Sequence, residues 1–460
     1  MEAVSFYGPP GTGKTETLVR VSRSLLEAQH KVCFVSYTKA AADECSNRIG
    51  NNKAGRTLHS LAYRLANISR AAVVSTGKLQ TFGEYMGIPC GTEAEDGEGD
   101  AYLACIHLAR AQLRRVDEVY DRFGRPGTYE RFKAFSASYI SWKEAYGLVD
   151  FSDMIERAMK TNWHLWFDTL IVDEAQDLSP VQWKFIDKMS PQLTKIIIAG
   201  DDDQAIFEWS GADPHGMASF DDRFNATRNV LSQSHRVPKA QFKLADSVIK
   251  RVSKRVPKEY RPTPEAGKVQ RGGGIWDLAF REGEYVLCRD KFKMFEMEQA
   301  AIQQGINYRM DGARGLRQRP FGVAMGIWNK LFVEEKDISK AELDKMMTAL
   351  DDKGKRLLME RNFAALKKRG WAVSIPMPTK ALEYFAHTRV SDDKPPVVFS
   401  TIHGAKGKEA DNVTIYTSAS QRVLDAYEHN PDAEHRLYYV GVTRSRKQLS
   451  IVDGVKSYEV

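Results

Sequence analysis

Residues 8–15 of the chain read GPPGTGKT, and the apolar run AVSFY occupies residues 3–7 directly before them. The pattern G-x-x-x-x-G-K-[ST] between a strand and a helix defines a P-loop, whose glycines let backbone N–H groups surround phosphate oxygens. Apolar residues at helical spacing follow over residues 17–29, and the run KVCFVSY covers residues 31–37. A strand, a helix and a second strand in this order predict a βαβ unit and therefore a parallel sheet.

Two further apolar runs fit the same sheet, and each is followed by acidic residues. TLIV at residues 169–172 precedes Asp173 and Glu174, and KIIIA at residues 195–199 precedes GDDDQ at residues 200–204. Ligands bind at the carboxyl ends of parallel strands, so we expect these ends to meet the P-loop at one edge. There Asp173 would hold the Mg²⁺ shell, and Glu174 would orient or deprotonate the attacking water.

The P-loop and the start of its helix supply the expected nucleotide contacts. Lys14 reaches the β- and γ-phosphates, the Thr15 hydroxyl binds Mg²⁺, and the positive helix N-terminus faces the same anion. Thr15 and Asp173 are the predicted metal ligands. The predicted nucleotide-binding residues here are Gly8, Pro10, Gly11, Thr12, Gly13, Lys14, Thr15 and Glu16.

Composition excludes several other classes of protein. The 460 residues allow about two to four domains that fold without disulfides or metal. The five cysteines are scattered and form no CxxC pair, so we expect neither a disulfide framework nor a zinc site, and we expect an intracellular protein. No apolar run approaches the roughly 20 residues of a membrane span, and the N-terminus resembles no secretory signal.

The net charge of +7 is compatible with nucleic-acid binding but does not demonstrate it. The charge is unevenly distributed along the chain. Residues 239–268 carry nine Lys or Arg against three Asp or Glu, whereas residues 93–100 carry five acids and no base. The basic stretch is either a solvated helix face or a source of non-specific phosphate affinity, and the acidic stretch has no assigned role.

The motif DEAQD at residues 173–177 resembles motif II of the UvrD/Rep-type superfamily 1 helicases. The resemblance continues in the family's order along nearly the whole chain. Further matches are residues 36–41 (motif Ia), 57–60 (motif Ib), 147–151 (the segment before motif II), 200–212 (motif III), 231–236 (motif IV), 400–409 (motif V) and 436–444 (motif VI).

The resemblance implies an α/β protein with two RecA-like P-loop motor domains, each with a parallel sheet and a mainly helical insertion. Strand-like runs at residues 230–231, 285–288, 397–400, 413–416 and 449–452 are assigned to the second sheet. Helical spacing is seen at residues 341–350 and 355–368, within the second insertion. The expected domains are motor domain 1 at residues 1–66 and 150–228, its insertion at 67–149, motor domain 2 at 229–325 and 396–460, and a reduced insertion at 326–395.

The resemblance also implies roles for residues beyond the P-loop. Gln204 is expected to contact the γ-phosphate, and Arg236 and Arg444 to act as arginine fingers, which are worth about 10³–10⁵ in rate in related enzymes. Together with Lys14, Asp173 and Glu174, they form the predicted catalytic set. His235 and Glu409 are further expected nucleotide contacts.

A DNA-binding set follows from the same motifs. The residues matching Tyr37, Phe207 and Trp209 stack on single-strand bases in the family, and such stacking is sequence-tolerant and worth roughly 1–3 kcal/mol per base. Thr57, His59, Thr401 and His403 complete the set as weaker candidates.

Two departures from the family pattern affect the expected adenine contacts. The chain begins seven residues before Gly8, without the family's upstream glutamine, and His235 replaces the adenine-stacking tyrosine of motif IV. We therefore expect relaxed selectivity for the nucleotide base.

Together, the residues and the resemblance predict a DNA helicase that depends on ATP and Mg²⁺, moves along single-stranded DNA and couples hydrolysis to cleft closure and duplex unwinding. Polarity 3′→5′ is implied by the resemblance alone. The expected partners are single-stranded DNA, junctions with duplex, and replication or repair proteins. The expected state is a cytoplasmic monomer, which is nucleoid-associated if the source is bacterial or phage. The alternatives are an ATPase that strips proteins from single strands without unwinding, the motor subunit of a helicase–nuclease complex, and an RNA helicase.

Overall fold

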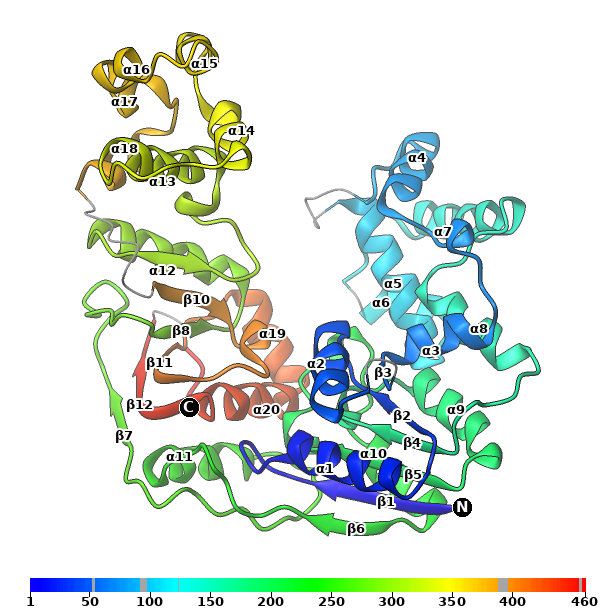
Figure 1. The fold of residues 1–460 in the computed structure, drawn as a ribbon. Coiled ribbons are helices and arrows are strands. Elements are labelled where there is room, and N and C mark those ends of the chain that lie inside the picture. The colour runs from blue at the N-terminus through cyan, green and yellow to red at the C-terminus, as the bar shows by residue number, and fades with distance from the viewer. Residues whose placement is uncertain (52–53, 92–96, 123, 388–395, 455–456) are drawn as a thin grey trace. The chain divides into compact units, whose positions relative to one another are not determined.

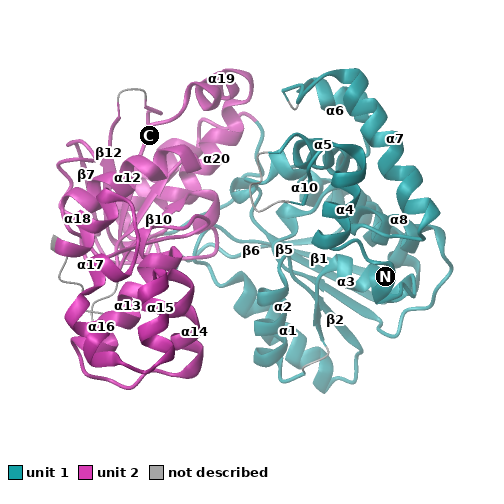
Figure 2. Ribbon diagram, turned by 90° about the horizontal axis from the view of Figure 1, so that it is seen from above, with its two compact units in different colours: residues 1–235, 254–261 teal, residues 236–253, 262–460 magenta. Residues whose placement is uncertain are grey.

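The computed structural model describes residues 1–51, 54–91, 97–122, 124–387, 396–454 and 457–460 (Figure 1). These residues form two compact units (Figure 2). Unit 1 comprises Met1–His235 and Lys254–Arg261, and unit 2 comprises Arg236–Ser253 and Pro262–Val460. The chain therefore leaves unit 1 after His235, returns to it for Lys254–Arg261, and then continues in unit 2. We call Lys254–Arg261 the return segment.

Unit 1 is built on a six-stranded sheet of order β3-β2-β4-β5-β1-β6, in which every pairing is parallel. Strand β4 shows why both faces of this sheet must be covered by other elements. Leu170 and Val172 belong to one apolar core, and Ile171 belongs to another. Such near-continuous apolar strands are typical of parallel sheets covered by helices on both faces. The strands are β1 Glu2–Tyr7, β2 Val32–Val35, β3 Gly55–Arg56, β4 Thr169–Val172, β5 Lys195–Gly200 and β6 Thr227–Val230.

Helices of unit 1 fall into two groups. Those that belong to the sheet are α1 Lys14–Glu27, α2 Lys39–Ile49, α3 Leu58–Leu65, α8 Phe151–Lys160, α9 Pro180–Met189 and α10 Gly216–Phe224, with short 3₁₀ turns at η2 Ala175–Asp177, η3 Ser190–Gln192, η4 Asp202–Gln204 and η5 Glu208–Ser210. The inserted group has an aromatic-rich core of its own. Its elements are η1 Arg70–Ala72, α4 Thr76–Met86, α5 Glu98–Gln112, α6 Val116–Arg122 and α7 Tyr129–Ala145.

Unit 2 repeats this plan with a sheet of order β7-β12-β11-β8-β10-β9, again parallel throughout. Its strands are β7 Lys268–Arg271, β8 Tyr285–Cys288, β9 Tyr308–Met310, β10 Val397–Thr401, β11 Ala410–Tyr416 and β12 Ser445–Val452. The flanking helices are α11 Lys239–Ile249, α12 Lys291–Gln303, α19 Gln421–His429 and α20 Pro431–Val442, with turns η6 Leu316–Gln318 and η7 His403–Ala405.

A second helical insertion interrupts unit 2 and has a separate apolar core. It consists of α13 Pro320–Phe332, α14 Lys340–Ala349, α15 Asp352–Met359, α16 Phe363–Arg369, α17 Trp371–Ser374 and α18 Thr379–His387. Two parallel sheets, each interrupted by helices, confirm the predicted fold class (Figure 1).

Two local predictions were wrong. Of the strand expected at residues 230–231 of the second sheet, Val230 is the end of β6, which pairs with β1 in the first sheet, and Leu231 lies beyond it. The helix expected at residues 355–368 is broken into α15 and α16, because Arg361 adopts a left-handed φ of 52° and the Asn362 side chain caps the second helix. Of the acidic stretch, residues 93–96 lie outside the described residues, and Glu98 opens α5.

The predictions about cysteines and membrane spans can also be compared with the structure. All five cysteines are buried and free of disulfide bonds. Every helix in the described ranges is too short or too polar to cross a bilayer.

A buried cluster of charges ties the inserted helices of unit 1 to α8. Asp150, which caps α8, accepts hydrogen bonds from Lys143 of α7 and Arg110 of α5, and both cations also bind Asp153. Burial opposes ionisation of Asp150, but the charges of His107, Lys143 and Arg110 outweigh it and hold the pKa of that carboxyl below its ordinary value. The cluster therefore stabilises unit 1 above the ordinary carboxyl pKa and loses that contribution as the pH falls.

Replacing Asp150 with Asn tests this cluster, because the amide keeps the helix cap and removes the charge that faces Lys143. We expect the free energy of unfolding to fall by about 3 kcal/mol, the lower end of the range for breaking a buried ion pair, since Asp153 still faces Lys143. Urea unfolding followed by circular dichroism measures the change. Asp121→Asn, which removes an exposed pair with Arg125, is the matched control and should leave the midpoint unchanged. Equal effects of the two variants would contradict the prediction.

Candidate functional site

Three neighbouring strands of unit 1 end at the same edge of the sheet. Tyr7 pairs with Gly200 across β1 and β5, and Val172 pairs with Ile198 across β4 and β5. The residues that follow these strands are Gly8, Asp173 and Asp201. The sheet therefore brings the P-loop, the acidic pair and the GDDDQ segment together, as the sequence predicted.

The P-loop has the shape of a phosphate cradle. Gly11 and Gly13 adopt left-handed φ angles of 78° and 79°, and Lys14 Nζ donates to the Gly8 carbonyl at 2.6 Å across the loop. A Cβ placed on Gly8 would lie 2.5 Å from Thr12 Oγ1 and 2.6 Å from Lys14 Cγ. Only glycine fits at this position without displacing the lysine that is expected to reach the phosphates.

The two predicted Mg²⁺ ligands are in direct contact. Thr15 Oγ1 donates to Asp173 Oδ2 at 2.7 Å. Burial and the neighbouring Glu174 raise the pKa of Asp173 to about 6, so an adjacent cation would favour its charged form. In the part of the chain that the structure describes, there is no cluster of three or more Asp, Glu, His or Cys side chains able to hold a metal. This donor set fits Mg²⁺, which is typically held by one or two protein ligands together with substrate phosphates.

Hydrogen bonds join Glu174 to Gln204 through two intermediate residues, Gln176 and Asp201. Gln176 donates to Glu174 Oε2 at 2.6 Å and accepts from the Asp201 backbone N–H at 3.0 Å. Gln204 Nε2 in turn donates to Asp201 Oδ2 at 2.7 Å. Glu174 has a left-handed φ of 54°, a conformation that non-glycine residues rarely hold without support from their surroundings. The sequence assigned no role to Gln176, although it lies inside the DEAQD motif.

Residues from the end of the first segment of unit 1 and from the return segment also form hydrogen bonds with the P-loop. The His235 backbone N–H donates to the Gly11 carbonyl at 2.8 Å, and Ser234 Oγ and Tyr260 OH donate to the Pro10 carbonyl at 2.9 and 3.0 Å. The predicted contact His235 therefore lies beside the loop, whereas Glu16 is exposed and pairs with Arg48. Tyr260 belongs to the return segment, and no local sequence pattern pointed to it.

Three aromatic side chains contact one another, and two of them follow Gln204 closely in the chain. The rings of Tyr37 and Phe207 stack at 5.7 Å with an angle of 6° between them, and Trp209 lies 6.3 Å from Phe207. Trp209 is 62% exposed and Tyr37 41% exposed, so this row presents open ring surface.

The motif Ib residues of the predicted DNA-binding set lie at the start of α3. Thr57 caps this helix, and His59 contacts the ring of Phe151 edge-on at 5.6 Å. Phe151, which is 64% exposed, was missed as a candidate, although it ends the motif segment that precedes motif II.

Apart from His235, which belongs to unit 1, the residues predicted from motifs IV to VI lie in unit 2. Arg236 pairs with Glu409 at 3.1 Å. Arg444 is buried and donates to the carbonyls of Val440 and Lys408, the latter directly before Glu409.

The two motif V candidates lie at the end of β10. Thr401 is the last residue of that strand, and its hydroxyl accepts from the Gly404 N–H at 3.1 Å. His403 opens the turn η7.

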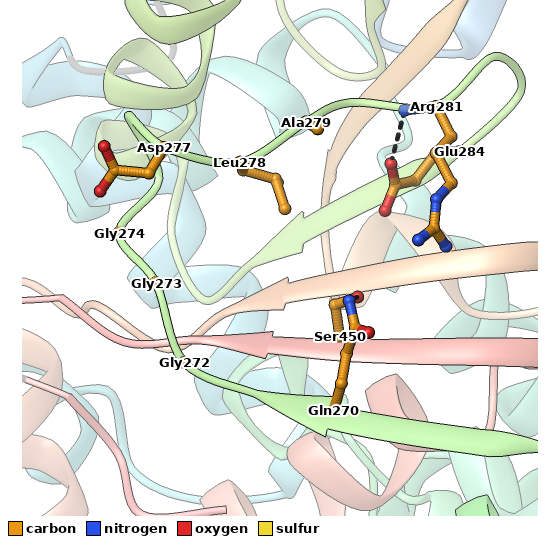
Figure 3. Close-up of a pocket in the computed structure, with 10 residues that line it drawn as sticks. All are labelled: Gln270, Gly272, Gly273, Gly274, Asp277, Leu278, Ala279, Arg281, Glu284 and Ser450. Atoms are coloured by element: carbon orange, nitrogen blue, oxygen red, sulfur yellow. Dashed lines mark hydrogen bonds between the residues drawn. The ribbon is translucent and has the colours of Figure 1, made fainter.

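A cavity of about 230 Å³ also lies in unit 2, between the end of β7 and the start of β8 (Figure 3). Glu284 is buried in its wall and accepts from the Arg281 backbone N–H at 2.9 Å. The site residues predicted above do not line this cavity, as its described wall shows: Gln270, Gly272, Gly273, Gly274, Asp277, Leu278, Ala279, Arg281, Glu284 and Ser450.

Comparison with known proteins agrees with this arrangement. Residues 2–209 match the family model described as an AAA domain, and residues 334–454 match the UvrD-like helicase C-terminal domain. ATP-dependent DNA helicase UvrD2 of Mycobacterium tuberculosis (strain ATCC 25618 / H37Rv) is 23% identical, over 96% of this chain and 75% of its own length. ATP-dependent DNA helicase PcrA of Bacillus subtilis (strain 168) is 23% identical, over 66% of this chain and 47% of its own.

Similarity extends to other helicases and to a solved structure. DNA helicase II of Escherichia coli (strain K12) is 25% identical over 54% of this chain and 38% of its own length, so the chain spans less than half of some relatives. Arterivirus nonstructural protein 10 (helicase) covers 98% of this chain and 59% of its own at 14% identity, with a TM-score of 0.37.

The parallel sheets, the P-loop and the acidic strand end define a P-loop NTPase with two RecA-like units. The order of the motifs and the two matching domains are more specific. The two matching domain models and the helicase relatives together support a UvrD/Rep-type superfamily 1 helicase.

Replacing Gly8 with Ala tests the cradle. The added methyl group would collide with Thr12 and Lys14. We expect the affinity for ATP to fall by about tenfold or more, because the distorted loop would no longer fit the phosphates. Fluorescent nucleotide titration measures the dissociation constant. Gly77→Ala is the matched control, since a Cβ there meets no atom within 4 Å. Unchanged affinity in Gly8→Ala would show that Lys14 does not need its present position.

Proposed function

We propose that the protein is a DNA helicase that depends on ATP and Mg²⁺, translocates 3′→5′ along single-stranded DNA and unwinds duplex. The observation that carries this proposal is the continuous path from Glu174 through Gln176 and Asp201 to Gln204, which lies three residues before Phe207. A change at the nucleotide can therefore reach the aromatic row through adjacent residues. The relatives named as DNA helicases support DNA as the track.

Hydrolysis is assigned to the edge of the unit 1 sheet. Lys14 binds the β- and γ-phosphates, and Glu174 accepts a proton from the water that attacks the γ-phosphorus as the bond to ADP breaks. Thr15 and Asp173 would hold Mg²⁺, which neutralises charge on the phosphates when bound. We assign Arg236 and Arg444 the arginine-finger role that their motifs imply, and closure of the two units on ATP belongs to the same proposal.

The aromatic row of Tyr37, Phe207 and Trp209 is assigned to single-strand bases. Ring faces bind any base, which suits an enzyme that must move along every sequence. Phe151, exposed beside His59, extends the assignment within unit 1. The proposed substrates are single strands and their junctions with duplex, and the proposed active form is a monomer.

Strand displacement on duplexes with a 3′ or a 5′ tail tests the whole proposal. The wild-type protein should hydrolyse ATP faster with single-stranded DNA and displace strands only from the 3′-tailed duplex. Lys14→Ala should lose ATP binding. Glu174→Gln should bind ATP and hydrolyse it about 10²–10⁴ times more slowly, as expected for loss of a general base.

Three outcomes would contradict parts of the proposal. DNA-stimulated hydrolysis that survives in Glu174→Gln would overturn the assignment of the base. Displacement from the 5′-tailed duplex would reverse the polarity. Hydrolysis without strand displacement would instead favour an ATPase that strips proteins from single strands.

Trp209→Ala tests the aromatic row. Loss of one stacked base should weaken single-strand binding by about 1–3 kcal/mol, which is roughly 5- to 150-fold in the dissociation constant. Fluorescence anisotropy with a labelled oligonucleotide at fixed salt measures it. Trp276→Ala removes an exposed tryptophan from unit 2 and should bind as wild type does. Similar losses in both variants would remove the special role of Trp209.

A further inference from the structure

The return segment places a fully buried lysine against three consecutive carboxylates of motif III. The side chain of Lys258 is 0% exposed, and its Nζ lies 3.1 Å from Asp201 Oδ1 and 2.9 Å from Asp203 Oδ2. Nζ also donates to the carboxylate of Asp202. All of these residues lie in unit 1, although the return segment is joined at both ends to unit 2.

The rest of the return segment reinforces this contact. Arg255 donates through two nitrogens to the carboxylate of Asp203, and the Val256 N–H donates to Asp202 Oδ2 at 2.7 Å. Burial opposes the charge of Lys258, but residues 201–203 outweigh it and raise the pKa of its ammonium group above the ordinary value. Lys258 is therefore held as a cation inside unit 1.

One member of this cluster, Asp201, forms a hydrogen bond with Gln204, the predicted catalytic glutamine. The Oδ1 atom of Asp201 faces Lys258. The Oδ2 atom of Asp201 accepts a hydrogen bond from Gln204 Nε2 at 2.7 Å. Asp201 also donates its backbone N–H to Gln176, whose amide binds Glu174. Lys258 thus fixes the side chain that orients Gln204.

We propose that Lys258 is a positioning residue for ATP hydrolysis: it holds Asp201 so that the Gln204 side chain keeps the orientation needed at the γ-phosphate. This inference rests on the proposed role of Gln204 in hydrolysis. Without Lys258, Arg255 still faces the three neighbouring carboxylates of residues 201–203, which would lie near an anionic substrate with one cation fewer. Asp201 must then move or take up a proton, and Gln204 loses a fixed hydrogen-bond acceptor.

Stability alone gives a poor account of this arrangement. A buried ion pair is seldom more stabilising than apolar side chains of the same volume, because both charges lose their hydration. A lysine whose three carboxylate neighbours include the partner of Gln204 is better explained by the geometry that it imposes on Gln204.

Lys258→Met tests the inference, because methionine has a similar length and no charge. We expect kcat for DNA-stimulated ATP hydrolysis to fall by about tenfold or more while the dissociation constant of ATP changes by less than about threefold. Lys250→Met is the matched control, since Lys250 forms an exposed pair with Asp246. The control should keep the wild-type kcat.

A double-mutant cycle separates positioning from general damage. If Lys258 acts through Gln204, then Lys258→Met should have little further effect in a Gln204→Ala background. Losses that multiply in the double variant, or a wild-type kcat in well-folded Lys258→Met, would overturn the inference. If the single variant does not fold, Lys258→Met with Asp202→Asn keeps the net charge of the cluster and leaves Asp201 intact; the same cycle is then measured on it.

The wild-type protein distinguishes this inference from the proposed function. Absence of DNA-stimulated hydrolysis in the wild type would defeat the proposed function itself. Normal hydrolysis in the wild type, with its loss in Lys14→Ala and no change in Lys258→Met, would defeat only the role of Lys258.

Discussion

The parallel register of β1, β4 and β5 is the constraint on which the rest of unit 1 depends. Leu170 and Val172 face one core and Ile171 faces the other, so a slip of one residue would exchange apolar faces along the buried strand. The same register sets the level at which each strand ends. It therefore places Thr15 Oγ1 within 2.7 Å of Asp173 Oδ2, although the two residues are 158 positions apart.

From this edge, hydrogen bonds lead from Glu174 to Gln204, and the chain continues from Gln204 to Phe207. Gln176 links Glu174 to the end of β5, and the turn that begins there carries first Gln204 and then Phe207. Because the turn is short and its acidic residues are buried, a displacement of Gln204 has few ways to be absorbed locally. Phe207, which is partly exposed and stacked on Tyr37, is the first residue after Gln204 along the chain that is not buried.

The sequence predicted what depends on neighbours in the chain and missed what depends on distant partners. The P-loop, the acidic strand ends and most strands follow from local patterns. By contrast, Tyr260 contacts Pro10 across 250 positions, and Lys258 lies in a basic stretch that resembles a solvated face. Strand β6 was misassigned for a related reason: all its residues are exposed, so it lacks the apolar signal of the central strands.

The buried charge clusters around Asp150 and around Lys258 both lie next to residues of the proposed site, which argues for a common physical role. Asp150 directly precedes Phe151 in the chain, and Asp203 directly precedes Gln204, so each cluster anchors the backbone next to a residue of the proposed machinery. Each also joins segments that are distant in sequence, through Arg110 in one case and Lys258 in the other. Apolar contacts would hold these segments together as well, but they tolerate sliding. Ion pairs with several hydrogen bonds fix direction as well as distance, which is what side chains that must meet a phosphate or a base require.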